Sequence, residues 1–287
     1  MHVANHAGRA CLVIDWHPDG TIRLADIEGA SDGRFGPDPM TLLEQWEPFT
    51  QWGRTAAAKP THRASNTELS APIPRPTQVL AVGTNYTDHA AEVGQNPTQA
   101  IFSKLPTCII GPAATVTLPT GTVDWEVELV AVIGRPAFQI PAAEAREYIA
   151  GFMVGQDLSE RASQFAGELP QFTLAKSRPG FGPTGPWLTT LDELADPTDL
   201  AICCQRNGES VQSSRTSAMI QGVDEVVAFI SAAVPLLPGD LVFTGTPSGV
   251  GYGRDPQLFL APGDHLTSMI EGLGQIDLDF VAGEERR

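Results

Sequence analysis

The segment that most constrains the fold is residues 123–133, Val-Asp-Trp-Glu-Val-Glu-Leu-Val-Ala-Val-Ile, in which acidic and apolar side chains alternate. This alternation predicts a β-strand, because successive side chains of a strand point to opposite faces. Glu126 and Glu128 are two residues apart, so they would share one face of this strand. Neighbouring carboxylates repel each other unless a cation lies between them. Exposure of both on an edge strand is the alternative that the spacing alone leaves open.

A third carboxylate follows the next predicted strand. Residues 152–154 have strand character and lead into Gly155 and Gln156, after which comes Asp157. Asp157 could therefore supply a third oxygen ligand to the same cation. Three carboxylates suit a hard cation such as Mg²⁺, which prefers octahedral oxygen coordination and keeps waters that a bidentate 2-oxo acid can displace.

The charge balance limits the partners. The 287 residues include 34 acidic and 18 basic side chains, which gives a formal net charge of −16. A field of this sign repels phosphate backbones and anionic lipid, so we expect neither nucleic acid nor a membrane as a partner. An anionic substrate would need a local cation, and a bound divalent metal would provide one.

Cysteine usage and the first residues indicate the compartment. The four cysteines form no CxxC pair, which is typical of reduced thiols in a cytosolic protein. The apolar run at residues 10–14 is too short for a signal peptide or a membrane span. We therefore predict a cytoplasmic protein.

Three prolines within residues 71–76 predict a domain boundary, because prolines at this density disfavour both helices and central strands. We predict a small N-terminal β domain at residues 1–74, a catalytic domain at residues 75–282 and a polar tail at residues 283–287. The fold class predicted from the pattern is α+β and rich in strands.

The elements expected within these domains fall into two sets. Strands are predicted at residues 11–15, 21–27, 79–82, 123–133, 152–154, 200–204, 241–244 and 265–270. Helical segments are predicted at residues 41–46, 89–93, 141–150 and 217–234. Turns are predicted at residues 17–20, 238–240 and 262–264, and Asn207-Gly208 predicts a hairpin.

Several short motifs, in the same order, resemble those of the fumarylacetoacetate hydrolase family, and its acylpyruvate hydrolases in particular. They are Val82-Gly-Thr-Asn-Tyr-Thr-Asp-His-Ala-Ala-Glu92, Phe102-Ser-Lys104 with Ile110-Gly-Pro112, Asp124-Trp-Glu-Val-Glu-Leu129, Gln156-Asp-Leu-Ser-Glu-Arg161, Leu174-Ala-Lys-Ser177 and Leu241-Val-Phe-Thr-Gly-Thr-Pro-Ser-Gly-Val-Gly251. The resemblance implies a mixed β-roll catalytic domain that forms a homodimer. It also implies that Glu126, Glu128 and Asp157 bind Mg²⁺ or Mn²⁺, with Ca²⁺ as an alternative.

His89 and Glu92 are three residues apart in a predicted helical turn, so they share a face. A carboxylate next to an imidazole fixes its tautomer and favours its protonated form, which suits a general base near neutral pH. A surface pair is the alternative that the spacing leaves open. In the enzymes that the sequence resembles, this segment is a lid and the pair activates water. The resemblance therefore implies that His89 is the base and Glu92 its orienting partner.

The resemblance also implies substrate contacts. Lys176 matches a lysine that contacts the substrate, and Arg161 and Gln164 match polar contacts. The loop at residues 244–251 lacks the lysine of a Walker phosphate loop. We interpret it as a backbone nest for a substrate carboxylate, with Thr246 as its side-chain contributor; loop flexibility is the alternative.

The predicted activity is hydrolytic C–C cleavage of a small anionic 2,4-dioxo acid through a metal-bound enolate. His89 would deliver water, and Lys176 would offset the negative charge. Isomerisation, tautomerisation or decarboxylation of a 2-oxo acid needs the same enolate and is the alternative. A non-catalytic, metal-stabilised binding protein is the rival from another class. Residues 159–162 and 176–179 depart from the family pattern, which leaves the substrate open, and Lys104 matches a family lysine without an assigned role.

Overall fold

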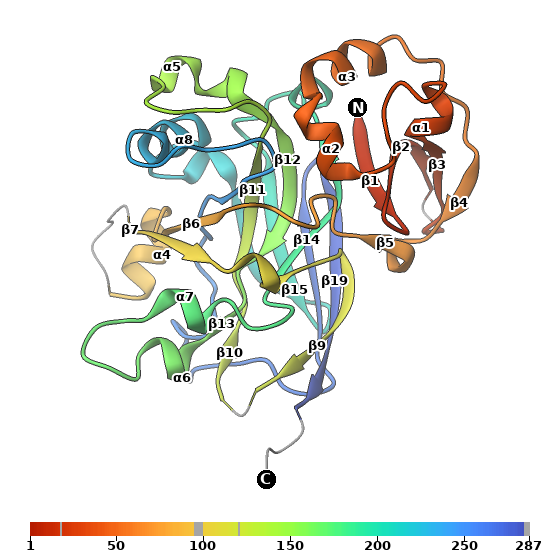
Figure 1. Cartoon of the computed structure of the whole chain (residues 1–287). Coiled ribbons are helices and arrows are strands. Elements are labelled where there is room, and N and C mark those ends of the chain that lie inside the picture. Colours follow the sequence, from red (N-terminus) through yellow and green to blue (C-terminus); the bar gives the residue numbers. More distant parts are fainter. Residues whose placement is uncertain (18, 95–99, 120, 284–287) are drawn as a thin grey trace.

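The computed structural model describes residues 1–17, 19–94, 100–119 and 121–283. Within these ranges the chain is α+β and rich in strands, which confirms the predicted fold class (Figure 1). The predicted tail at residues 283–287 lies outside the described residues except for Gly283. No helix in the described ranges is long and apolar enough to cross a membrane.

The large mixed sheet has twelve strands in the described part of the chain. Ten of them follow one another in the order β4 (His62–Ala64), β3 (Ile22–Asp26), β2 (Arg9–Trp16), β1 (His2–His6), β14 (Gly182–Thr189), β12 (Ile149–Gln156), β11 (Val127–Ile133), β17 (Leu241–Phe243), β6 (Val79–Gly83) and β7 (Ala100–Lys104). Two short strands add to it, β5 (Leu69–Ser70) on β1 and β8 (Ile109–Ile110) on β14. The strands are mostly antiparallel, but β17 pairs with β6, and β14 with β8, in parallel.

A smaller sheet lies beside the first. Its five strands, counted over the described residues, are β16 (Glu209–Arg215), β15 (Ala201–Arg206), β18 (His265–Ile270), β19 (Gly274–Ala282) and β9 (Ala113–Leu118). A separate two-stranded ladder joins β10 (Val123–Asp124) to β13 (Ser159–Glu160). One core cluster contains Leu129 of β11 together with Ile202 of β15 and Leu266 of β18, so the two sheets pack face to face.

The helices are short and lie around these sheets (Figure 1). They are α1 (Ile27–Ala30), α2 (Pro39–Glu44), α3 (Trp46–Gly53), α4 (Thr87–Glu92), α5 (Ala142–Ala145), α6 (Arg161–Gln164), α7 (Phe172–Ala175) and α8 (Val223–Ser231). Phe49 of α3 packs in a second cluster with Val130 of β11 and Phe243 of β17. Strand β11 is therefore covered on both faces, and all seven of its residues are buried.

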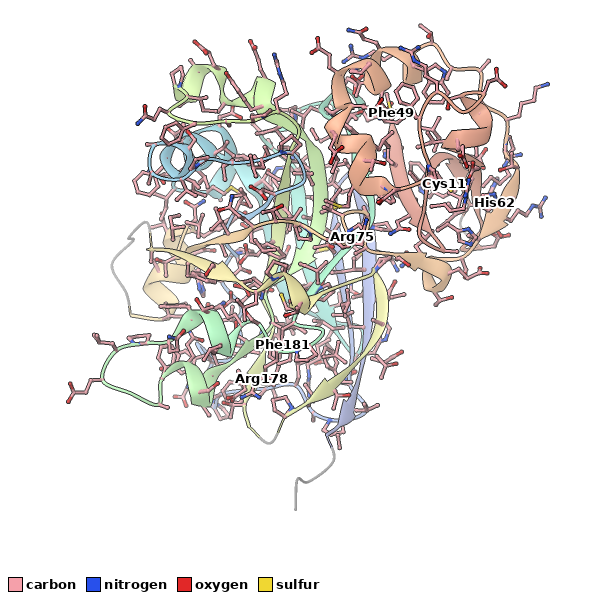
Figure 2. The ribbon with its side chains drawn as sticks, in the orientation of Figure 1. Cys11, Phe49, His62, Arg75, Arg178 and Phe181 are labelled. Carbon is pink, nitrogen blue, oxygen red and sulfur yellow. The ribbon has the colours of Figure 1, made fainter. Side chains whose placement is uncertain are left out.

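The amino-terminal strands continue the large sheet. Strand β1 pairs with β14 through His2↔Thr189 and Val3↔Leu188. In Figure 2, Cys11, Phe49 and His62 lie in the amino-terminal part, whereas Phe181 lies near α6 and α7 on the other side. The domain boundary at residues 71–76 stays a prediction, and the pairing of β1 with β14 means that one sheet crosses it.

Most predicted elements are present, and three need correction. The predicted strand at residues 123–133 is interrupted at Trp125 and Glu126, because side-chain amides of Gln156 and Gln212 accept the backbone N–H groups of Glu126 and Val127. The helix predicted at residues 141–150 gives way to a 3₁₀ turn at Arg146–Tyr148 and then to β12, because Ile149 pairs with Ile133.

The helix predicted at residues 217–234 begins later, at Val223. Asn85 holds the preceding residues away from a helical path. Its backbone C=O accepts from Ile220 N at 2.8 Å, and its side-chain oxygen accepts from Gln221 N at 3.0 Å. The predicted hairpin at Asn207-Gly208 is confirmed, since both residues have positive φ, at 53° and 81°, as a tight hairpin turn requires.

Candidate active site

Three buried carboxylates meet where β11 begins and β12 ends. The two strands pair through Val127↔Gln156, and Asp157 N donates to Glu126 O at 2.9 Å, so Asp157 lies opposite Glu126. One oxygen each of Glu126, Glu128 and Asp157 lies within 4.8 Å of the others. The structure thus brings together the three residues predicted as metal ligands, and it buries them in place of the exposed edge that was the alternative.

Two buried cations lie against this triad. Lys176 Nζ donates to Glu126 Oε2 and to Asp157 Oδ2, both at 2.7 Å. Arg161 Nη2 donates to Glu126 Oε1 at 2.7 Å. Glu128 differs from its neighbours, because within the described ranges it forms no ion pair and accepts only the Gly245 N–H, at 2.7 Å.

The surroundings shift the two glutamates in opposite directions. Burial raises the pKa of Glu128 well above its ordinary value, and the charges of Asp157 and Glu126 add to this effect. Burial also opposes ionisation of Glu126, but Lys176 and Arg161 outweigh it and lower the pKa of that carboxyl. The site therefore has one carboxylate too many for its own cations. Oxygen-only donors with this excess charge fit a hard divalent cation.

Lys104 and Asp124 complete the charged cluster. Lys104 Nζ donates to Asp157 Oδ1 at 2.6 Å and to the backbone oxygens of Lys176 and Phe181. Asp124 accepts from Arg161 Nε and Nη2 at 2.9 and 2.8 Å and from Gly251 N at 2.6 Å. Sequence reasoning left both without a role, although both lie inside motifs that carry the family resemblance.

The predicted dyad is present on α4. His89 Nδ1 lies 3.2 Å from Glu92 Oε2, and the His89 side chain is only 7% exposed, which excludes a surface pair. This contact assigns the Nδ1 proton to the side facing Glu92 and leaves Nε2 to exchange a proton. Glu92 is itself held by Gly249 N, at 2.9 and 3.1 Å from its two oxygens.

A second contact ties α4 to the same loop. Ser248 Oγ donates to Asp88 Oδ2 at 2.7 Å. Gly253 lies so close to Glu92 that a Cβ at this position would overlap the Glu92 side chain. Helix α4 is therefore docked on the loop that follows β17. The lid predicted around residues 87–95 stays a prediction, and its last residue, 95, lies outside the described residues.

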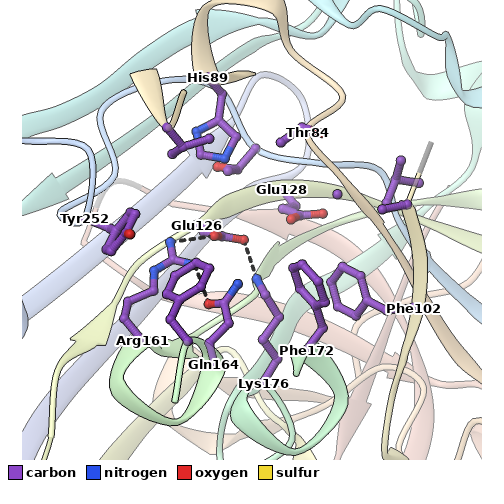
Figure 3. A pocket seen from close by; sticks show the side chains of 16 residues that line it. Thr84, His89, Phe102, Glu126, Glu128, Arg161, Gln164, Phe172, Lys176 and Tyr252 are labelled. Atoms are coloured by element: carbon purple, nitrogen blue, oxygen red, sulfur yellow. Dashed lines mark hydrogen bonds and ion pairs between the residues drawn. The ribbon is translucent and has the colours of Figure 1, made fainter. Parts of the chain in front are cut away.

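One cavity is lined by His89 of the dyad and by Glu126 and Glu128 of the triad (Figure 3). His89 lies on one side of it, Glu126 and Glu128 lie in the middle, and Arg161 and Lys176 lie on the opposite side. The residues that line it are Val82, Gly83, Thr84, His89, Val93, Ala100, Phe102, Glu126, Glu128, Arg161, Gln164, Phe165, Phe172, Lys176, Thr246 and Tyr252.

Gln164 and Thr246 line the cavity but already have partners. Gln164 Oε1 accepts from Arg161 Nη1 at 2.9 Å. Thr246 Oγ1 donates to Val127 O and accepts from Gln212 Nε2, both at 2.8 Å. With its proton directed at β11, the Thr246 hydroxyl can offer a ligand only an acceptor lone pair. Their predicted roles in substrate binding stay predictions.

The fold and the site define the class of protein. Residues 78–281 match the family described as fumarylacetoacetate (FAA) hydrolase C-terminal. This match covers more than half of the chain, which therefore belongs to the fumarylacetoacetate hydrolase family of enzymes. The chain is 43% identical over 249 residues to human mitochondrial oxaloacetate tautomerase FAHD2A, covering 84% of this chain and 79% of that protein.

Solved structures agree with this assignment. A Mycobacterium smegmatis protein provisionally named HpcE is 50% identical, with a TM-score of 0.92 over 99% of this chain and all of that one. A Mycobacterium abscessus protein provisionally named 2-hydroxyhepta-2,4-diene-1,7-dioate isomerase is 31% identical, with a TM-score of 0.82 over 99% of this chain and 98% of that one. Maleylpyruvate hydrolase from Sphingobium sp. SYK-6, in complex with manganese(II) and pyruvate, is 26% identical, with a TM-score of 0.78 over 99% of this chain and 100% of that one.

Proposed function

We propose that the protein is a keto–enol tautomerase of a small 2-oxo acid, moving a proton at the carbon next to the 2-oxo group. The observation that carries this proposal is that His89, Glu126 and Glu128 line one cavity, with Glu92 bonded to His89 and Asp157 beside the two glutamates. Removal of a proton α to a carbonyl requires a base on one side and, on the other, positive charge that stabilises the enolate. Lys176, Arg161 and a divalent cation held by the triad would supply that charge.

The chain's own residues divide the work. His89 Nε2 takes the proton from the carbon next to the 2-oxo group and delivers it to the oxygen of that group to give the enol, or carries it the opposite way, while Glu92 holds the imidazole through Nδ1. Lys176 and Arg161 offset the substrate carboxylate and the charge that develops on the 2-oxo oxygen. Glu126, Glu128 and Asp157 would hold Mg²⁺ or Mn²⁺, with Ca²⁺ as the alternative; when bound, the ion supplies Lewis-acid polarisation of the 2-oxo group.

The relatives support tautomerisation as the first candidate reaction and hydrolysis as the second. The oxaloacetate tautomerase match is at 43% identity, whereas the maleylpyruvate hydrolase match is at 26%. Hydrolytic C–C cleavage of an acylpyruvate, which the sequence put first, is the second candidate. The buried and oriented His89 favours it too, because an imidazole in this position can activate water as well as take a carbon-bound proton.

The experiment follows three substrates after metal removal and after reloading with Mn²⁺. Oxaloacetate and phenylpyruvate report tautomerisation through loss of enol absorbance and solvent deuterium uptake at C3. Acetylpyruvate reports cleavage through release of pyruvate. We expect metal-dependent acceleration of tautomerisation and little cleavage. Stoichiometric pyruvate from acetylpyruvate would favour the second candidate, and no acceleration of any reaction would contradict both.

The homodimer and the cytoplasmic location stay predictions. The FAHD2A relative is named as mitochondrial, which describes that protein. A small anionic 2-oxo acid as the partner of this site is part of the present proposal.

A further inference from the structure

Two pairs of stacked aromatic rings form walls of the active-site cavity. Phe102 and Phe172 have ring centroids 5.1 Å apart with planes inclined by 23°, and Phe165 and Tyr252 have centroids 4.9 Å apart with planes inclined by 25°. All four side chains line the cavity and are only half-buried. The rings therefore keep apolar surface that the described part of the protein leaves uncovered.

Each pair adjoins one of the two cations of the site. Lys176 Nζ lies 5.3 Å from the centroid of Phe102, and the guanidinium carbon of Arg161 lies 5.8 Å from the centroid of Tyr252. Figure 3 shows Phe102 and Phe172 beside Lys176, with Tyr252 beyond Arg161 on the other side. The aromatic walls of the cavity therefore lie directly beside the two cations that contact the triad.

Both cations already bond to side chains of the site, and the proposed function assigns them to the 2-oxo acid end of the substrate, so neither is left for a second carboxylate. Lys176 bonds to Glu126 and Asp157, and Arg161 bonds to Asp124, Glu126 and Gln164. Among the described lining residues, His89 is the remaining side chain that can carry positive charge, and it faces Glu92.

The formal charges of the buried cluster also argue against a second carboxylate on the substrate. The cluster contains four carboxylates and three cations, namely Asp124, Glu126, Glu128 and Asp157 against Lys104, Arg161 and Lys176. A divalent cation on the triad would change this excess of one negative charge into one positive charge, which a single substrate carboxylate neutralises. A second carboxylate would be desolvated against aromatic rings without a partner, which is costly.

We propose that the substrate is a 2-oxo monoacid with an uncharged, planar apolar substituent that lies against the Phe102–Phe172 and Phe165–Tyr252 pairs. This inference rests on the proposed function, which supplies the 2-oxo acid end. The proposed monoacid differs from oxaloacetate, the substrate in the name of the tautomerase relatives, because oxaloacetate carries a second carboxylate at its far end. Aromatic rings favour such a substituent through burial and offset stacking.

The test measures binding to the Mn²⁺-loaded protein by calorimetry with three oxalate-like probes. Oxamate carries the acid end alone, N-phenyloxamate adds an apolar ring, and N-oxalylglycine adds a second carboxylate. We expect N-phenyloxamate to bind about 10-fold or more tightly than N-oxalylglycine, the scale of an aromatic contact together with an unpaired charge. Equal or tighter binding of N-oxalylglycine would overturn the inference while leaving the proposed function intact.

Variants of the aromatic walls test where the phenyl ring of N-phenyloxamate binds. Phe172→Ala and Tyr252→Ala each remove one ring of a stacked pair, and we expect each to reduce the preference for N-phenyloxamate over oxamate by about 5- to 10-fold. Phe138→Ala is the matched control, since its ring is 53% exposed and outside the cavity lining, and its preference should equal that of the parent. An unchanged preference in both wall variants would overturn the inference. Failure of all three probes to bind would overturn the proposed function and this inference with it.

Discussion

Lys104 Nζ donates to Asp157 Oδ1 at 2.6 Å, and neither side chain has any exposed surface. Lys104→Met removes the charge and keeps most of the volume, which leaves Asp157 with Lys176 as its remaining cation. Breaking a buried ion pair costs about 3–5 kcal/mol, and we expect the lower end here because Lys176 remains. Urea unfolding at equilibrium measures this loss. Lys59→Met, at an exposed position, is the control, and equal stability of the two variants would contradict the role assigned to Lys104.

Glu128→Gln separates metal binding from folding. Because burial, Asp157 and Glu126 raise the pKa of Glu128, its charge destabilises the metal-free fold, and the neutral amide should unfold at the same or a higher urea concentration. Mn²⁺ affinity should fall by about 10- to 100-fold or more. This is the loss expected when a residue that hydrogen-bonds to a metal ligand is removed, and losing a ligand itself should cost at least as much. Calorimetric titration with Mn²⁺ tests this, with the exposed Glu144→Gln as control. Parental Mn²⁺ affinity, or full activity of the parent in EDTA, would rule out the triad as the metal site.

His89→Ala should lower turnover by about 10²-fold or more, the scale of losing a general base. The turnover of Glu92→Gln should lie between those of His89→Ala and the parent, because the imidazole remains but loses the carboxylate next to Nδ1. Both should retain Mn²⁺ affinity. Turnover and Mn²⁺ titration measure the two effects, with the exposed His17→Ala as control. Parental turnover by His89→Ala would exclude the dyad from both candidate reactions.

Helix α4 is held by Ser248 and Gly249, and we expect it to open on the timescale of amide exchange, as segments that close over sites do. Oxalate should slow hydrogen exchange of α4 in the Mn²⁺-loaded protein. Ser248→Ala, which removes the bond to Asp88, should speed this exchange in the absence of oxalate, whereas the exposed Ser213→Ala should not. Exchange that stays constant while oxalate binds tightly would argue against a lid.

His2 makes stability depend on pH. Burial, followed by the charge of the amino terminus, lowers the pKa of its imidazole to about 4 against the opposing effect of Glu193. A depressed folded-state pKa means that the contribution of His2 is fully present above about pH 6.5, the unfolded value, and is lost as the pH falls toward 4. At most about 2 kcal/mol would be lost between pH 6.5 and 5. Urea unfolding at several pH values should show a shallower acid loss in His2→Gln, and identical slopes would refute this assignment.

That Glu126 and Glu128 share one face could be predicted from their spacing, whereas their role as metal ligands together with Asp157 was implied by the family resemblance and stays a prediction. Glu126 and Glu128 are two residues apart, and Asp157 directly follows β12, which pairs with the strand that carries them. The proximity of His89 and Glu92 could be predicted in the same way, since they share one helical turn, but their roles as base and orienting partner were implied by the resemblance and stay predictions. Patterns with a period of two or three to four residues carry this information along the chain.

Contacts between distant segments could not be predicted in the same way. The aromatic walls come from β7, the residue that follows α6, α7 and the loop after β17, and no spacing relates Phe102 to Phe172. Lys104 and Asp157 are 53 residues apart and meet only when β7 packs near the end of β12. The interruption at Trp125 arises because Gln212, 85 residues away, takes the N–H of Val127. These features depend on tertiary structure, which overrides local propensity.

The pairing of β1 with β14 has a consequence for how the chain can be divided. A fragment starting after the proline segment would expose one backbone edge of β14 along the register that now faces β1, and unpaired edges recruit strands from other chains. Trp187 and Leu188, now covered by residues of β1 and β2, would lie beside that open edge. The first seventy residues thus cover the backbone edge of β14 in the large sheet. A chain that lacks them would be prone to aggregate through β14.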